Sequence, residues 1–445
     1  MSKQKTILAL VADETGEVFE YPGLLMAGMN GISIRQPEAD ELIPLPEGSR
    51  LFTIPGTPPI GFDHKSGQQI TIDSLPDNWG GGAAQAVSAF TTPAFTRTLL
   101  PAAAYEKKDV DLTLWSYTAV GWCVEEERFY VAAVRVDRNQ QWEPKYFDDR
   151  KLEPLVRKRV AEQPDNRLIK QLSRCALDYH CFAAKNLFFG RWEAPLPCSP
   201  TCNARCIGCI SLQDEPTICQ SSQDRLNFVP TVEELCAVAV PHLQRAENAL
   251  VSFGQGCEGD PILQADRIAE SVREMRRQTS RGTINFNSNA SIPDAIDKLA
   301  DAGIDSIRIS LNSVQERFYN AYHRPVKYRF EDVIESARRA KQHGLFTMIN
   351  YLVFPGITDR EDEIEKLLEL IDTLGIDLIQ MRNLSIDPML YWKSMQTESS
   401  GIGMKKMLDR VKKEIPRIQY GYFNRTKDSY YPPGYESDWP LPAVL

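Results

Sequence analysis

Residues 195–385 alternate short apolar runs with amphipathic stretches, and this alternation limits the fold more than any other feature of the chain. The apolar runs are rich in β-branched residues, and the stretches between them repeat apolar residues at helical spacing. Repeated strand and helix units build a parallel sheet, either open or curled into a barrel. We therefore expect an α/β fold, a partial (β/α) barrel of about six parallel strands. The predicted strands are 194–199, 249–256, 283–289, 305–311, 346–354 and 377–383.

Three helices between these strands have clear end signals. They are predicted at 293–303, 330–344 and 358–375, and each range closes on a glycine, as helix C-termini commonly do. The last of them is expected to begin at a cap formed by Thr358 and Asp359, because short polar side chains accept hydrogen bonds from the first free amides of a helix.

The rest of the chain has a different character. Residues 1–150 contain alternating apolar and polar runs separated by turn-rich pieces, which predicts a β-rich N-terminal domain. Residues 151–190 are expected to form a helical linker, and residues 191–385 the barrel. Residues 386–445 should hold a helix and then an aromatic, proline-rich segment that wraps a surface or closes one end of the barrel as a lid.

Composition and charge restrict the function. The 445 residues carry a formal net charge of -9, which argues against a general binder of nucleic acid, because that affinity comes mostly from Lys and Arg on phosphates. No uncharged apolar run approaches the roughly 20 residues that a membrane span needs. The first residues lack the apolar core of a signal peptide, so we expect a cytoplasmic protein without a membrane segment.

Cysteines are concentrated in one short segment. The chain has ten cysteines, and the stretch PLPCSPTCNARCIGCIS at 195–211 holds four of them. Cytosolic thiols stay reduced, so a dense group of cysteines indicates metal binding or catalysis rather than disulfides. Cys202, Cys206 and Cys209 form a C-x3-C-x2-C pattern, and Cys198 does not begin a second copy of it.

Two kinds of metal site agree with these thiols to different degrees. A structural zinc usually has four ligands in two close pairs, and here the nearest histidines, His180 and His242, lie far away in sequence. An iron–sulfur cluster is held by thiolates, and three of them leave one iron of a cubane without a protein ligand. The pattern favours a cluster with one open iron, and zinc stays as the less favoured alternative.

The segment CNARCIGC resembles the cluster-binding motif of the radical S-adenosylmethionine (SAM) enzymes, and the resemblance extends over roughly 190–385. It implies a [4Fe–4S] cluster held by Cys202, Cys206 and Cys209, whose open iron chelates the amino and carboxylate groups of SAM. Reduction would then cleave SAM to methionine and a 5′-deoxyadenosyl radical, which abstracts hydrogen from a substrate that the sequence does not identify.

The resemblance also suggests SAM contacts. Glu258, Gly259 and Asp260 fall in a segment similar to the glycine-rich motif that closes over the methionine part of SAM. Later strand ends carry polar residues, which meet at one edge of a parallel β/α fold. The candidates there for cofactor binding are Asn287, Asn289, Ser310 and Asn350, and Arg308 and Arg382 are further polar residues of these strands. Many family members have an aromatic residue where this chain has Gly208.

The implied partners are an electron donor, such as flavodoxin or ferredoxin, and an unknown substrate. A peptide, a protein or a small molecule is favoured over RNA because the chain is acidic. The different class that stays open is a non-catalytic iron–sulfur or zinc protein acting as a binding module. The glycine-rich segment and the polar strand ends favour the enzyme, since a structural metal needs neither.

Overall fold

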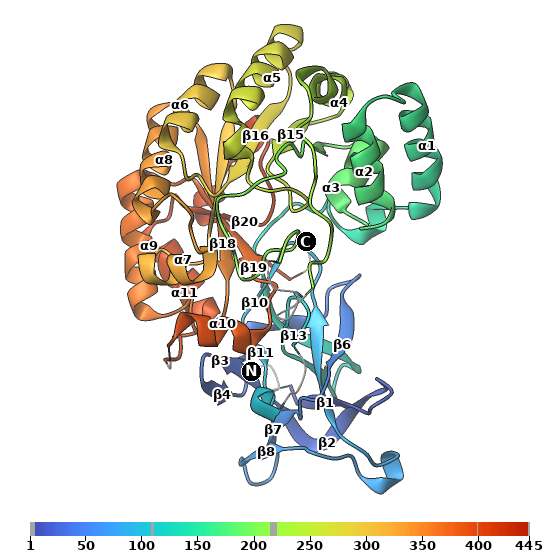
Figure 1. Cartoon of the computed structure of the whole chain (residues 1–445). Coiled ribbons are helices and arrows are strands. Elements are labelled where there is room, and N and C mark those ends of the chain that lie inside the picture. Colours follow the sequence, from blue (N-terminus) through green and yellow to red (C-terminus); the bar gives the residue numbers. More distant parts are fainter. Residues whose placement is uncertain (1–4, 108–110, 214–219, 398, 444–445) are drawn as a thin grey trace.

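A seven-stranded parallel sheet forms the centre of the computed structural model (Figure 1). The model describes residues 5–107, 111–213, 220–397 and 399–443. The sheet is curled into a half-barrel, which confirms the predicted partial barrel, and it has one strand more than the six that were predicted. Its strands follow the chain order: β14 (Glu193–Pro195), β15 (Leu250–Phe253), β16 (Thr283–Ser288), β17 (Ser306–Leu311), β18 (Phe346–Val353), β19 (Leu378–Asn383) and β20 (Gln419–Gly421).

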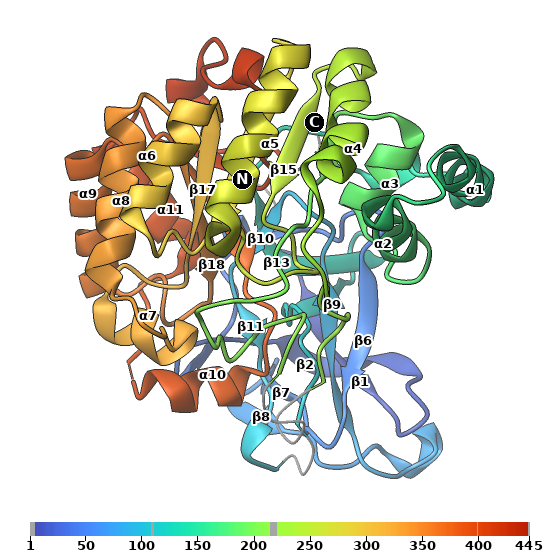
Figure 2. The ribbon, with the colours of Figure 1, turned by 45° about the horizontal axis from the view of Figure 1, so that its top comes forward.

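Helices cover the outer face of this sheet (Figure 2). They are α4 (Val232–Arg245), α5 (Ala265–Gln278), α6 (Pro293–Ala302), α8 (Phe330–Gln342), α9 (Glu361–Leu374) and α11 (Met404–Glu414). Outward-facing strand residues such as Val251, Phe286 and Ile349 join the helices in one apolar core. Two shorter helices, α7 (Glu316–His323) and α10 (Pro388–Met395), follow β17 and β19.

The start of α9 differs from the prediction. The helix begins at Glu361 rather than at Thr358 or Asp359. The Asp359 carboxylate instead accepts hydrogen bonds from the Gly356 and Gly403 amides, at 2.6 and 2.9 Å, and from the Asn30 side chain at 2.5 Å. The residue that resembles a helix cap in the sequence therefore joins the N-terminal region to the barrel.

The N-terminal region is rich in antiparallel strands, as predicted. One sheet contains β1 (Ile7–Ala12), β2 (Val18–Met26), β5 (Leu42–Pro44), β6 (Arg50–Ile54), β7 (Ile60–Asp63), β8 (Gln69–Thr71), β9 (Gln85–Phe90), β10 (Phe95–Arg97), β12 (Val120–Cys123) and β13 (Arg128–Arg135). A smaller sheet contains β3 (Gly28–Asn30), β4 (Ser33–Arg35) and β11 (Leu100–Pro101). The helices α1 (Leu152–Glu162), α2 (Arg167–Leu177) and α3 (Phe182–Phe189) then lead into β14.

A buried arginine connects the N-terminal region to the barrel. Arg97, at the end of β10, donates to the carbonyl oxygens of Tyr117, Val353 and Leu384 at 3.2, 3.1 and 2.8 Å. The last two carbonyls lie at the ends of β18 and β19. The N-terminal region is therefore fixed against the carboxyl side of these strands.

The C-terminal tail packs against the amino ends of barrel strands. The Tyr430 ring stacks on Phe346, the first residue of β18, with centroids 4.1 Å apart. The Lys427 amide donates to the hydroxyl of Thr283, the first residue of β16. The aromatic segment thus packs on the amino ends of the strands, away from the cysteine motif.

In the described ranges, the helices lack the length and apolar character needed to cross a membrane.

Candidate functional site

The three motif cysteines lie in the loop that leaves the carboxyl end of β14. Cys202, Cys206 and Cys209 have free thiols and line one cavity of about 510 Å³. Its other lining residues include three arginines and several apolar side chains: Arg205, Arg225, Arg324, Ile207, Leu212, Val326 and Leu390. The structure therefore brings the predicted ligands together at the end of the barrel where parallel β/α folds place their sites.

The end of α7 supports the cysteine loop. The backbone amides of Arg205 and Ile207 donate to the carbonyls of His323 and Tyr322, at 2.9 and 3.1 Å. The His323 Nδ1 lies 3.3 Å from the Cys206 sulfur, and burial lowers the pKa of this histidine to about 3. A neutral imidazole thus faces the second thiol of the motif.

The electrostatic surroundings of the thiols suit a metal centre. Burial raises the pKa of Cys202 to about 12 and raises the pKa of Cys206 well above its usual value. Such thiols stay protonated at neutral pH until a metal displaces the protons. Arg225 Nη2 lies 3.4 Å from the Cys209 sulfur and places a positive charge beside the third thiol of the motif. The residues present therefore fit a centre held by thiolates.

The three sulfurs do not converge on one point. Within the described ranges, no three His, Cys, Asp or Glu side chains lie close enough together to bind a single metal ion. The thiolate ligands of an iron–sulfur cubane bind different irons, so they surround a volume instead.

Tyr322 occupies the space beside Gly208. A β-carbon added at Gly208 would lie 2.9 Å from the Tyr322 hydroxyl, and Tyr322 is buried. The space beside position 208 is therefore filled by a ring from α7.

Glu258 connects two loops of the site. Its Oε2 accepts hydrogen bonds from the amides of Cys198 and Ser199, at 2.7 and 2.8 Å. Its Oε1 accepts from the amides of Gly254 and Gln255, at 3.0 and 2.7 Å. Burial nevertheless raises the pKa of Glu258 to about 7. The Glu258 carboxylate, which the sequence suggested as a SAM contact, is therefore directed at four backbone amides, and it fixes the glycine-rich turn to the start of the cysteine loop.

Asp260 and Asn289 continue this network. The Asp260 carboxylate accepts from the Ser288 hydroxyl at 2.6 Å and from the Asn289 amide at 2.7 Å. The Asn289 side chain donates to the Asn203 side chain, inside the cysteine motif, at 2.8 Å. The end of β16 is thus connected through hydrogen bonds to both loops. Gly259 lies between them, and its amide donates to the Ser199 carbonyl.

The remaining predicted residues lie on the inner face of the sheet, which is the face turned away from the helices. Asn287 donates to the Phe253 and Gly254 carbonyls at 2.8 and 3.0 Å, so its amide holds the glycine-rich turn. Asn350 and Ser310 are neighbours on β18 and β17, with the amide nitrogen 3.4 Å from the hydroxyl. Both are partly exposed, so they are accessible to a ligand.

Sequence reasoning missed four residues of the site: Asn203, Arg225, Tyr322 and His323. Asn203 and Arg225 could have been suspected from their positions in or after the motif. Tyr322 and His323 gave no signal, because more than a hundred residues separate them from the cysteines that they contact.

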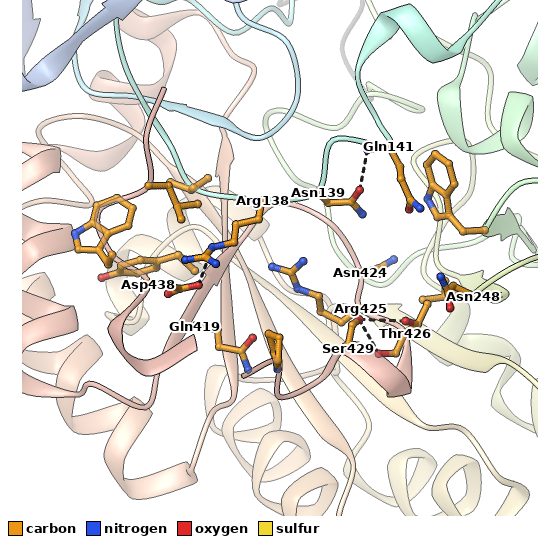
Figure 3. Close-up of a pocket in the computed structure, with 17 residues that line it drawn as sticks. Arg138, Asn139, Gln141, Asn248, Gln419, Asn424, Arg425, Thr426, Ser429 and Asp438 are labelled. Carbon is orange, nitrogen blue, oxygen red and sulfur yellow. Dashed lines mark hydrogen bonds and ion pairs between the residues drawn. The ribbon is translucent and has the colours of Figure 1, made fainter. Parts of the chain in front are cut away.

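A second cavity lies at the opposite end of the barrel (Figure 3). It measures about 300 Å³ and is lined by the first residues of β15 and β20, Leu250 and Gln419. Its two arginines are balanced, because Arg138 pairs with Asp438 at 3.3 Å and Arg425 pairs with Asp137 at 3.2 Å. This cavity therefore offers weaker grounds for a functional site than the cysteine cavity.

Comparison with known proteins gives one family and several distant relatives. The model of the Radical SAM superfamily matches residues 196–371. FeMo cofactor biosynthesis protein NifB of Klebsiella pneumoniae is 24% identical over 226 residues, which are 48% of this chain and 44% of that protein. GTP 3',8-cyclase of Chlorobaculum tepidum is 24% identical over 220 residues, which are 49% of this chain and 60% of that protein. The chain thus spans about half the length of the curated relatives it matches.

Solved structures resemble the chain at lower similarity. The [FeFe]-hydrogenase maturase HydG superposes with a TM-score of 0.37 at 15% identity, over 62% of this chain and 66% of that one. Methylornithine synthase (PylB) gives a TM-score of 0.37 at 15% identity, over 61% of this chain and 74% of that one.

Proposed function

We propose that this chain, whose residues 196–371 belong to the radical SAM superfamily, is an enzyme that cleaves SAM reductively and abstracts hydrogen from a substrate. Members of the superfamily use a [4Fe–4S] cluster and SAM. In this chain Cys202, Cys206 and Cys209 would hold the cluster. The observation that carries the proposal is that these three free thiols face one cavity after the first barrel strand.

When bound, the cluster and SAM supply an electron transfer that yields methionine and a 5′-deoxyadenosyl radical. The residues of the chain position these groups. Arg225 contacts the Cys209 sulfur, and the α7 end fixes the conformation of the cysteine loop. Asp260 and Glu258 hold the adjacent loops through backbone amides, so the turn proposed to contact SAM is preorganised.

The polar inner face is proposed to bind SAM and the substrate. The candidate contacts are Gly259, Asn287, Asn289, Ser310 and Asn350. Glu258 supports the site through its backbone contacts. An external reductant is needed, and we propose a flavodoxin or a ferredoxin. The substrate is proposed to be a peptide, a protein or a small molecule.

Anaerobic reconstitution with iron and sulfide tests the proposal. We expect a brown protein that forms 5′-deoxyadenosine when SAM and dithionite are added. A protein that stays colourless and retains zinc alone would instead be a metal-containing binding module. The protein with Cys198→Ala is a matched control, because Cys198 lies in the same loop but packs in the barrel core.

A further inference from the structure

The inner face of the sheet is polar around Ser310 and Asn350, and closer to the amino ends of the strands it carries the apolar residues Phe346, Met348 and Leu378. On β17, Ile307 and Ile309 pack in the core beneath the helices, and Arg308 and Ser310 alternate with them on the opposite face. Arg382 occupies the corresponding face of β19, next to the core residue Met381. The polar residues are partly exposed, whereas their outward-facing neighbours are buried, so the inner face borders accessible space.

Arg308 reaches across to β19, because it donates to Gln380, which precedes Arg382 by two residues on the same face of that strand. Burial and, as a smaller effect, the positive charge of Arg382 together lower the pKa of Arg308 to about 9. Two guanidinium groups that repel each other on a half-buried surface are unfavourable unless an anion neutralises them.

Neither arginine has such an anion among the residues that the structure describes. Arg308 Nη1 donates to the Gln380 side chain at 3.2 Å, and its buried Nε has no hydrogen-bond partner. Arg382 Nη1 donates to the Tyr422 carbonyl at 2.9 Å, and its guanidinium lies 4.5 Å from the Tyr422 ring. In the described ranges neither forms an ion pair, unlike the arginines of the second cavity.

Glu193 is the acidic residue whose negative charge raises the pKa of Arg308, and it already accepts hydrogen bonds from neutral donors. Glu193, on β14, accepts hydrogen bonds from the Ser252 hydroxyl at 2.7 Å and from the Asn424 amide at 2.9 Å. In the described ranges Glu193 forms no ion pair with Arg308 or Arg382, so no carboxylate neutralises either guanidinium by direct contact. The Asn350 Oδ1 is also buried without a partner, so a donor group of a ligand could bond to it.

We propose that Arg308 and Arg382 together bind an anionic group of the substrate, a carboxylate or a phosphate, on the inner face of the barrel. This inference rests on the proposed function, since it names the substrate class of the same site. Guanidinium groups recognise both anions through paired N–H donors, which a lysine cannot reproduce. Gln380 is a positioning residue, because it holds Arg308 from the side and donates to Asn424 at 3.1 Å.

Thermal unfolding of the full chain in the presence of inorganic phosphate or succinate tests the arginine pair. Chloride keeps the ionic strength constant, and the titration is run with and without SAM. At least one of the two anions should raise the melting temperature of the wild type. Arg308→Gln and Arg382→Gln should each weaken that binding at least about 30-fold, as loss of one partner of a buried charge pair does. Arg157→Gln, at an exposed surface ion pair, should bind like the wild type.

The inference is overturned if neither anion raises the melting temperature of the wild type more than chloride does. It is also overturned if the anions stabilise Arg308→Gln and Arg382→Gln as much as the wild type. Equilibrium dialysis with SAM and with decarboxylated SAM separates the two possible sources of a carboxylate. If both glutamine variants bind SAM like the wild type, a substrate anion occupies the pair. If they lose affinity for SAM but not for the decarboxylated form, the pair binds the SAM carboxylate and the inference is wrong.

These measurements are independent of SAM cleavage. A wild type that forms 5′-deoxyadenosine but binds no anion contradicts this inference alone. A wild type that binds phosphate through the two arginines but never cleaves SAM contradicts the proposed function alone.

Discussion

Gly259 lies so close to Thr201 that a β-carbon at residue 259 would stand 1.9 Å from the Thr201 carbonyl oxygen. The Gly259 amide donates to the Ser199 carbonyl at 2.7 Å, and the next amide, of Asp260, donates to Thr201 at 2.9 Å. The glycine-rich turn and the cysteine loop are thus in direct backbone contact, which leaves no room for a side chain.

Gly259→Ala is therefore expected to lower the free energy of unfolding by roughly 2–4 kcal/mol, because the two loops must separate. Urea unfolding followed by circular dichroism measures this loss. Gly190→Ala is the control, since Gly190 has a positive φ but nothing within 4 Å of an added β-carbon. That change should cost about 1 kcal/mol. Equal losses in the two variants would contradict the contact as the cause.

The pH dependence of stability should contain a contribution from Glu258. Burial raises its pKa from 4.5 to about 7, so the folded protein holds the proton more tightly than the unfolded chain. Protonation of Glu258 contributes about 3 kcal/mol to the free energy of unfolding. This contribution is fully present below pH 4.5 and is lost as the pH rises through 7. Unfolding free energies measured across this window should show a shallower fall for Glu258→Gln. Glu365→Gln, at an exposed position of α9, should keep the wild-type slope.

Each of the changes Cys202→Ala, Cys206→Ala and Cys209→Ala should reduce the iron content and the visible absorbance after reconstitution. Loss of one thiolate leaves a corner of the cubane without its protein ligand. Production of 5′-deoxyadenosine should fall to background in all three variants. Cys198→Ala should retain iron and activity, and an equal loss in that variant would remove the distinction between the motif and its neighbour.

Arg97→Met is expected to destabilise the fold by about 3 kcal/mol, because three buried carbonyls lose their charged donor. Methionine retains much of the apolar volume, so the loss reports the hydrogen bonds. The urea midpoint is the measurement. Arg128→Met, at an exposed position, should leave that midpoint nearly unchanged. A small effect of Arg97→Met would show that other contacts hold the N-terminal region against the barrel.

The strands β15 to β19 could be predicted because each is an apolar run in a repeating pattern. The strand β20 could not, since Gln419–Gly421 is three residues long and its place in the sheet depends on pairing with β19. The first strand is shorter than the predicted 194–199, and it ends at Pro195. Pro197 cannot donate a backbone hydrogen bond, which limits any extension of this edge strand.

The cysteine motif was visible in the sequence because its three members are close along the chain. The polar strand ends were visible because the sheet periodicity places them. The support from His323 and Tyr322 depends on the folding of α7 over the loop, which no local pattern encodes. The role of Glu258 could not be predicted either. A glutamate that accepts hydrogen bonds from four amides cannot be distinguished by sequence from one that binds a ligand.

The different composition of the two faces of the sheet determines how mutations affect this protein. Helix-facing residues such as Ile307 maintain the fold, and inner residues such as Arg308 have little part in the core. Mutations at partly exposed inner positions such as Ser310 can therefore alter ligand preference with small effects on folding. New specificity could be selected or engineered there, on a scaffold whose stability is determined on the other side of the sheet.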